Sequence, residues 1–312
     1  MINLLVRTLD GGSKLIEESK NQLIPRALPE KDWLTEMLNQ FDHPSTALWR
    51  AIEAKQVSNY VSKINLEKKL ILDLGCGEGK VSSIIFDGEV DIIGLDISKE
   101  DIIKAKRRGN YRELIIGDAQ RLPFSDKSVD LVFSNSVLEH IPDIFMVLKE
   151  VSRILQKNGK LVFTVPDDQF GNYLFLYVLA ERLGLKGFAR WYSKRRNQLL
   201  NHFHCYSPKV WEYKLKEADL DMVYAKYYLS KSTIQIWDFL AICIFIMRRI
   251  GIFRTKMYSL LLNKSRKIRV AIFKKVLYKY YYQGCQIGGG LLIVAKKSKL
   301  VSDGASPLAV DY

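Results

Sequence analysis

The sequence predicts an α/β protein built on one mostly parallel sheet with helices on both faces. Three observations favour this fold class. Short apolar runs bounded by Gly, Asp and Asn alternate with longer amphipathic stretches from Lys69 onward. The chain has 312 residues, 48% of them apolar, which is enough for one large core. Alternating strand and helix patterns of this kind are typical of parallel sheets.

Seven apolar runs have the length and composition of strands. In chain order they are residues 70–74, 91–96, 114–118, 129–135, 160–166, 221–229 and 288–297. Right-handed crossovers between parallel strands place the connecting helices on both faces of the sheet. The last two runs are separated by some sixty residues, so an insertion is expected between them.

Apolar residues at helical spacing fill most of the intervening segments. Two helices are expected within residues 31–60, with a break at His43-Pro44, and a further helix begins at Pro208 with Ser207 as its N-cap. Other helices are predicted at 80–86, 99–108, 144–155 (with a stop at Asn158-Gly159) and 172–185. The basic, histidine-containing segment 194–207 is predicted to be a loop.

The four cysteines (Cys76, Cys205, Cys243 and Cys285) show no CxxC pair and no metal-ligand spacing. This pattern argues for reduced thiols and against a disulfide scaffold or a zinc site, so no metal is expected. The N-terminal apolar stretch is too short for a signal peptide. A cytoplasmic location is therefore predicted.

The net charge of +14 is concentrated late in the chain. Residues 1–170 hold 23 Lys and Arg against 26 Asp and Glu, whereas residues 171–300 hold 25 against 6. A basic segment of this kind suits an anionic partner.

The first strand ends in a glycine-rich loop, Asp73-Leu74-Gly75-Cys76-Gly77-Glu78-Gly79. Glycines allow a tight turn and a close approach of ligand to backbone. A dinucleotide fingerprint would need a third glycine where Lys80 stands, and the P-loop pattern also fails. The carboxylate of Asp73 would disfavour a pyrophosphate and suit a cationic ligand.

In these motifs the chain resembles the class I S-adenosylmethionine-dependent methyltransferases, of the type 11-like, small-molecule branch, over residues 69–166 and the last strand. The resemblance implies a Rossmann-like seven-stranded sheet whose last strand is antiparallel, and S-adenosyl-L-methionine as the cofactor. It also implies that Asp73 and the glycine loop hold the methionine part, Asp96 the ribose hydroxyls, and Asp118 the adenine amino group. Ser134, beside Asn135, falls in the segment that lines the pocket. The predicted cofactor-binding residues are Asp73, Gly75, Cys76, Gly77, Gly79, Asp96, Ile97, Asp118, Ala119, Asn135 and Leu138.

Candidates for a general base on the acceptor side are few, because the chain has four histidines. His43 precedes the core. His140 follows the fourth strand, while His202 and His204 lie in the basic segment after the fifth strand. These three are the catalytic candidates, with Glu139 as a further possible base; each also has a structural interpretation.

An apolar stretch at 234–247 contains Gln235 and Asp238 and is too short to span a bilayer. The following residues to 282, among them Arg254 and Lys256, alternate basic and apolar side chains. Residues 234–282 are therefore predicted to dock on an anionic membrane surface, with Trp237 and the tyrosines at headgroup depth. A helical lid and a nucleic-acid patch are the alternatives.

The predicted domains are N-terminal helices (1–68), the cofactor-binding core (69–166), a cap segment with the sixth strand (167–228), a basic apolar insertion (229–288), the last strand (289–300) and a flexible tail (301–312). The predicted activity is methyl transfer to a small, lipidic, aromatic or lipid-linked glycan acceptor, in the cytoplasm or peripherally at the inner face of a membrane. An RNA methyltransferase and a catalytically silent membrane-binding scaffold are the rival hypotheses. The acceptor, the methylated atom and the oligomeric state stay open.

Overall fold

The computed structural model describes residues 31–86, 90–249 and 266–298. The predicted tail at 301–312, the first thirty residues of the predicted N-terminal segment, and Arg254 and Lys256 lie outside these residues. The described residues from Trp33 onward belong to one structural unit.

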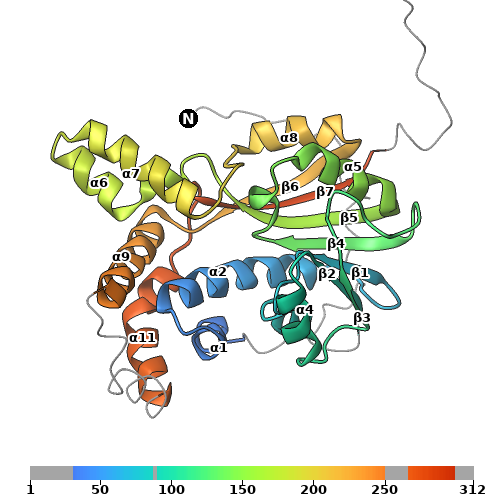
Figure 1. Cartoon of the computed structure of the whole chain (residues 1–312), viewed down its shortest axis with the longest axis horizontal. Coiled ribbons are helices and arrows are strands. Elements are labelled where there is room, and N and C mark those ends of the chain that lie inside the picture. The colour runs from blue at the N-terminus through green and yellow to red at the C-terminus, as the bar shows by residue number, and fades with distance from the viewer. Residues whose placement is uncertain (1–30, 87–89, 250–265, 299–312) are drawn as a thin grey trace, which may run out of the picture. The chain divides into compact units, whose positions relative to one another are not determined.

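Seven strands form one sheet in the order β3-β2-β1-β4-β5-β7-β6 (Figure 1). Their bounds are Leu70–Leu74 (β1), Asp91–Asp96 (β2), Glu113–Ile116 (β3), Val129–Asn135 (β4), Leu155–Pro166 (β5), Leu220–Tyr228 (β6) and Gly290–Lys297 (β7). Strands β1 to β5 pair in parallel, and β7 runs antiparallel to both β5 and β6. The predicted fold class is confirmed.

Side chains of the strands alternate between two apolar layers, as the period of a β-strand requires. In β1, Ile71 packs into the layer that contains the N-terminal helices, and its neighbours Leu72 and Leu74 pack into the layer of α5 and α8. Figure 1 shows α5 and α8 on one side of the sheet and α1 and α2 on the other. Asp73, between Leu72 and Leu74, therefore points to the α2 side.

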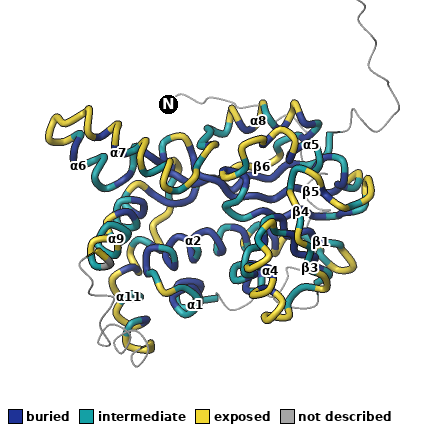
Figure 2. Tube along the Cα trace, in the orientation of Figure 1, coloured by how far each residue is buried: buried dark blue, intermediate teal, exposed yellow. Residues whose placement is uncertain are grey.

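The helices begin with α1 (Trp33–Gln40) and α2 (Pro44–Val61), which break at His43-Pro44 as predicted. Pro44 occupies the first turn of α2, where its missing N–H costs nothing. Most of α2 is buried (Figure 2), because α1, α9 and α11 pack around it. Four helices flank the core strands: α3 (Ser82–Ile85), α4 (Lys99–Lys106), α5 (Ile144–Ile154) and α8 (Pro208–Glu217).

Among the described residues, two 3₁₀ helices and four further α-helices complete the structure. They are η1 (Leu138–His140), η2 (Phe170–Tyr173), α6 (Phe175–Arg182), α7 (Lys186–Leu199), α9 (Lys231–Arg249) and α11 (Arg266–Tyr281). Helices α9 and α11 lie between β6 and β7 in the sequence, where an insertion was expected. The proposed domain limits themselves stay predictions.

Three local predictions differ from the structure in their bounds or in the type of element. The helix α5 ends at Ile154, and Asn158-Gly159 lies in a bulge inside β5, because Leu155 already pairs with Val129 before Lys160 pairs with Leu131. Much of the predicted loop 194–207 is helical, since α7 continues to Leu199. The third predicted strand ends at Ile116, two residues early.

Trp237 is partly buried against the core. Its ring centroid is 5.3 Å from that of Trp49 and 5.8 Å from that of Phe170, so it packs beside the core. This location contradicts the predicted place of Trp237 at headgroup depth. Asp238 is fully buried beside it.

Candidate functional site

The loop after β1 turns through three glycines with positive φ: Gly75 (74°), Gly77 (52°) and Gly79 (71°). A Cβ on Gly75 would collide with Val137, and one on Gly79 with the Tyr111 ring. At Gly77 a Cβ would meet nothing within 4 Å. The backbone at Gly77 therefore faces open space, which is what a loop that approaches a ligand needs.

Asp96, at the end of β2, ties this loop to the neighbouring strand. Its Oδ2 accepts a hydrogen bond from the Gly77 N–H at 2.8 Å, and its Oδ1 accepts one from the Ser98 N–H at 2.8 Å. Each oxygen keeps a further lone pair for a ligand hydroxyl. Ile97, next to Asp96, is 74% exposed.

Asp73 is almost completely buried below the loop. Its Oδ2 accepts hydrogen bonds from the Ser82 hydroxyl at 2.5 Å and the Tyr111 hydroxyl at 2.6 Å. Burial raises the pKa of Asp73 to about 6, while these two donors oppose the rise. Asp73 is therefore mainly ionised at neutral pH. Burial also raises the pKa of the Cys76 thiol, so this loop residue stays a neutral thiol.

The ends of the next strands lie at the same edge of the sheet. The Gly117 N–H donates to the Asp96 carbonyl oxygen at 3.0 Å, and the Ser134 hydroxyl donates to the Leu74 carbonyl oxygen at 3.0 Å. Asp118 is exposed there and caps the following turn by accepting the Gln120 N–H at 2.9 Å. The fold thus brings together the acids predicted after β1, β2 and β3.

Beyond β4 the chain is held in an unusual conformation. Ser136 has a φ of 51°, in the left-handed region that a residue with a side chain rarely adopts. Its N–H donates to Thr164, and its hydroxyl donates to Glu53 Oε1 at 2.7 Å. Asn135 donates its amide to Glu53 Oε2 at 2.8 Å. Leu138 follows and is fully buried.

Glu53 of α2 is the centre of this network, and the sequence analysis missed it. Its buried carboxylate also accepts hydrogen bonds from Arg50 at 2.5 Å and from the Tyr228 hydroxyl at 2.7 Å. Burial raises the pKa of Glu53, but Arg50 and the hydroxyl donors outweigh burial and hold it below its usual value. The signal in the sequence that could have pointed to Glu53 is a single acid within the mostly apolar run ALWRAIEA.

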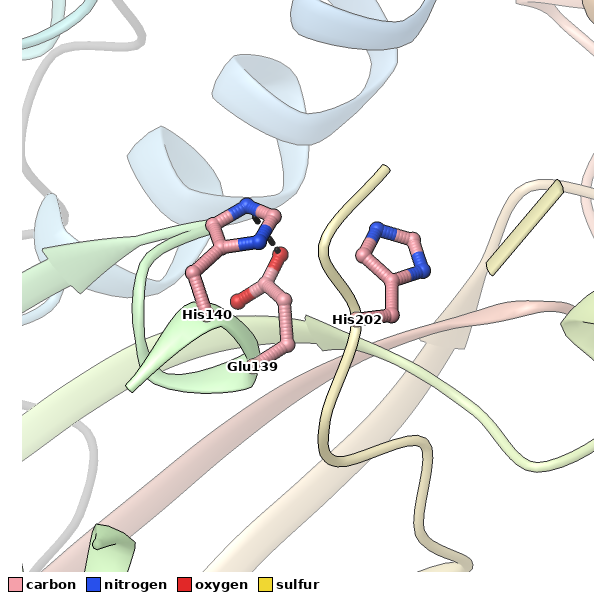
Figure 3. A group of neighbouring side chains, drawn as sticks. All are labelled: Glu139, His140 and His202. Atoms are coloured by element: carbon pink, nitrogen blue, oxygen red, sulfur yellow. Dashed lines mark ion pairs between the residues drawn. The ribbon is translucent and has the colours of Figure 1, made fainter. Parts of the chain in front are cut away.

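Glu139, His140 and His202 form a second group beside this network (Figure 3). One oxygen of Glu139 lies 3.7 Å from His140 Nε2, and the ring centroids of the two histidines are 5.4 Å apart. Burial raises the pKa of Glu139 to about 8 and lowers that of His202 to about 4. Burial also lowers the pKa of His140. The structure therefore joins two of the three predicted histidines with Glu139.

The third predicted histidine, His204, has a different environment. Its Nδ1 lies 2.9 Å from the Tyr206 hydroxyl, and its Nε2 lies 2.8 Å from the Ile141 carbonyl oxygen. Because a carbonyl oxygen can only accept, Nε2 carries the proton. Both nitrogens of His204 are engaged, which suits a structural role between η1 and the segment before α8.

A surface hollow lies at the opposite edge of the sheet. Asn65, Lys69, Asp130 and Gly159 are among the residues that line it, near the amino ends of β1 and β4. It is therefore separate from the loop and from the Glu139 group.

Known proteins resemble this chain mainly in the segment that contains the glycine loop and the strand-end acids. Residues 72–163 match the family model described as a methyltransferase domain. The chain is 33% identical over 106 residues to a malonyl-[acyl-carrier protein] O-methyltransferase of Legionella pneumophila, covering 32% of this chain and 37% of that protein. It is 30% identical over 123 residues to a ubiquinone biosynthesis O-methyltransferase of Coxiella burnetii, covering 38% and 53%. The chain thus spans about half or less of these relatives.

Solved structures extend the likeness to the fold. A sarcosine dimethylglycine methyltransferase from Galdieria sulphuraria aligns over 78% of this chain and 84% of its own, with a TM-score of 0.50 and 16% identity. A chain from the complex of the Haloferax volcanii Trm112 methyltransferase activator with a methyltransferase aligns over 86% and 100%, with a TM-score of 0.51 and 18% identity. At these identities the similarity concerns the fold alone.

Proposed function

We propose that this chain transfers a methyl group from S-adenosylmethionine to an oxygen atom of a small apolar acceptor, because residues 72–163 match the model of a methyltransferase domain. The single observation that carries the proposal is the open backbone at Gly77, flanked by ionised Asp73 and by Asp96. The two O-methyltransferase relatives support oxygen as the methylated atom.

When bound, the cofactor supplies a methyl group on a positively charged sulfur, which is already a good leaving group. The residues of the chain then bind the cofactor and the acceptor and orient them toward each other. We assign the cationic methionine part to the Asp73 carboxylate and the backbone of Gly75, Gly77 and Gly79. A buried carboxylate attracts such charges strongly. Cys76 contributes its backbone at the same turn.

We assign the nucleoside part of the cofactor to residues at the ends of β2 and β3. Asp96 has lone pairs left for both ribose hydroxyls, a bidentate contact that needs a carboxylate. We place the adenine between the exposed Ile97 side chain and the Asp118-Ala119 turn. We place Asn135 and Leu138 on the opposite wall, where the Glu53 carboxylate accepts a hydrogen bond from the side-chain amide of Asn135 at 2.8 Å.

The acceptor belongs beside Glu139, His140 and His202. These are titratable side chains next to Leu138, and a hydroxyl acceptor must lose its proton during the transfer. The oxygen lone pair forms the new bond to the methyl carbon, the carbon–sulfur electron pair stays on sulfur, and the hydroxyl proton passes through this group to water. Positioning of the two reactants supplies most of the acceleration.

Calorimetry with the purified chain tests the cofactor. S-adenosylmethionine is expected to bind with 1:1 stoichiometry, and Asp96→Ala is expected to weaken binding about tenfold or more, since it removes charge-assisted hydrogen bonds. Asp126→Ala is the matched control, because Asp126 is 72% exposed and pairs with Arg153 away from the loop. Absence of binding to the wild-type chain would contradict the proposal.

We further propose that α11 docks on anionic membrane, which would suit a lipidic acceptor. Along this helix Ile268, Ile272 and Val276 follow one another at intervals of four residues and are 50–61% exposed. Exposed lysines flank this stripe, among them Lys267, Lys275 and Lys279. An exposed apolar stripe between cations favours a lipid surface over nucleic acid. Within the described residues, no helix is long and apolar enough to cross a bilayer.

Vesicle flotation tests the docking. The wild-type chain is expected to float with vesicles rich in anionic lipid at low salt, and Ile272→Glu to reduce the bound fraction severalfold. Val210→Glu on α8, where the valine is 39% exposed, is the matched control. Equal flotation of all three proteins, or a gel shift with RNA in place of flotation, would contradict the membrane proposal.

A further inference from the structure

Glu139, His140 and His202 bring one potential metal-ligand atom each to within 4.8 Å of one another. Glu139 and His140 come from η1, and His202 comes from the turn after α7, far along the chain. Figure 3 shows the three side chains facing a common space. This convergence depends on the fold, so the sequence spacing gave no sign of it.

The hydrogen bonds of both histidines leave Nε2 as the free nitrogen. His140 Nδ1 lies 3.1 Å from the Asn201 carbonyl oxygen, and His202 Nδ1 lies 3.1 Å from Asn197 Oδ1. The Cys205 sulfur is also 3.8 Å from His202 Nδ1, but its thiol donates to Asn197 Oδ1. Both partners are acceptors, so Nδ1 is the protonated nitrogen of each neutral ring, and Nε2 presents a lone pair. Metal-binding histidines are usually anchored in this way through their second nitrogen.

The carboxylate of Glu139 completes a set of electron-pair donors that lacks a cation. Glu139 is 2% exposed, and its Oε2 has no hydrogen-bond partner within the described part of the chain. Its Oε1 faces His140 Nε2 at 3.7 Å, beyond hydrogen-bond distance. The Arg50 guanidinium is engaged with Glu53 at 2.5 Å. A positive ion between the three side chains would satisfy all of these atoms.

We propose that Glu139, His140 and His202 bind one divalent transition-metal ion of the zinc class. Two histidines with one carboxylate, and a fourth position open to substrate, is a ligand set of catalytic zinc sites. Metal–ligand distances of about 2.0–2.2 Å require the ligand atoms to close by roughly 1 Å on binding. The His140 side chain is 40% exposed, so the ion can enter from solvent.

The use of the ion rests on the proposed function. A hydroxyl acceptor in the open position would have its O–H pKa lowered by the ion, as happens to metal-bound water. Its proton would then leave to solvent, and its oxygen would be ready to take the methyl group.

Titration of the full chain, stripped with a chelator, tests the site. Calorimetry with Zn²⁺ and visible absorption with Co²⁺ are expected to show one ion per chain. Glu139→Gln, His140→Gln and His202→Gln are each expected to weaken binding about tenfold or more, by analogy with losses at known metal sites. His43→Gln is the control, because this histidine lies at the start of α2 away from the group.

The outcomes separate the two proposals. No stoichiometric ion, or equal affinity in all five proteins, would overturn the metal site even where S-adenosylmethionine still binds. The alternative is that Glu139 is protonated and no ion is bound. In that case Glu139→Gln will keep the melting temperature of the wild-type chain and no metal will bind, which also overturns the metal site. Metal binding without cofactor binding would overturn the proposed function and leave the metal site standing. Circular dichroism of every variant identifies any that fail to fold.

Discussion

Asp73 and Glu139 are both buried carboxylic acids, but their surroundings differ. Two hydroxyl donors keep the pKa of Asp73 at about 6, whereas Glu139, with one unpaired oxygen, has a pKa of about 8. In the absence of a cation, Asp73 is therefore mainly charged at neutral pH and Glu139 mainly protonated. Residue type alone could not distinguish them.

The titration of Asp73 predicts how cofactor affinity depends on pH. Below about pH 6 its carboxyl is protonated and loses its attraction for a cationic ligand, so affinity should fall toward about tenfold per pH unit. Above pH 7 affinity should level off. Asp73→Asn should bind more weakly at pH 8 and lose the dependence near pH 6. Calorimetry from pH 5 to 8 measures both effects, and an unchanged slope in the variant would refute the assignment.

Gly77 and Gly184 form a matched pair for testing the loop. Both have positive φ (52° and 74°), and a Cβ on either would meet no atom within 4 Å. Gly77→Ala and Gly184→Ala should each cost about 1–2 kcal/mol of folding stability, because an L residue is strained in this conformation. Gly77→Ala alone should abolish cofactor binding, because the methyl group occupies the ligand's approach. Equal affinity in the two variants would argue against a ligand at Gly77.

Among the elements, α9 is the one whose sequence pattern misled most. Its apolar stretch suggested an exposed face with Trp237 at its surface, but the side with Trp237 packs against α2 and α6, while Phe239, Phe245 and Ile246 are 41–63% exposed. Asp238 forms the link: it accepts hydrogen bonds from the Phe175 N–H at 3.0 Å, the Tyr192 hydroxyl at 2.8 Å and Arg196 Nε at 3.0 Å. One buried acid thereby fastens α6 and α7 to α9.

Removal of that acid should loosen the helices without affecting the sheet. Asp238→Ala leaves the Arg196 charge and two further donors without their acceptor, a loss of about 3–5 kcal/mol locally. Hydrogen exchange should accelerate in α6 and α7, and stay unchanged in β1 and β4. Asp168→Ala, at an exposed position, is the control. Uniform acceleration throughout the chain would show that these helices do not open separately.

On the scale of the whole molecule, Glu53 joins parts that are distant in sequence. Its carboxylate binds α2 to the end of β4 through Asn135 and Ser136, and to the end of β6 through Tyr228. The strained φ of Ser136 is thus maintained by a helix that precedes the entire core. Stability and site geometry depend on the same side chain.

Glu53→Gln should therefore lower both global stability and cofactor affinity. Loss of the charge leaves Arg50 without its partner, which should reduce the free energy of unfolding by about 3 kcal/mol or more. Urea denaturation measures this change. Glu113→Gln on β3, where the side chain is exposed, should change stability by less than about 0.5 kcal/mol. Similar losses in the two variants would contradict the central role of Glu53.

The sequence was sufficient for the sheet and for the edge where the strand-end acids meet. Glycine spacing and strand-end acids depend on local rules, so Asp73, Gly77 and Asp96 could be located from it. Glu53 could not, because its partners come from α2 itself, from the end of β4 and from β6. The sequence also could not distinguish His204 from His202 as a candidate base, because only tertiary contacts decide which ring nitrogens stay free. The location of Trp237 also depended on its partners Trp49 and Phe170.

The insertion between β6 and β7 begins and ends at one point. The Gly289 N–H donates to the Leu229 carbonyl oxygen at 3.0 Å, and Tyr228 pairs directly with Gly290. The sheet would need no more than a hairpin turn there. Helices α9 and α11 therefore form an insertion that does not alter the strand order of the sheet. They can be exchanged for another segment without rethreading a single strand, so the proposed membrane docking of α11 can change while the strand ends around Gly77 stay the same.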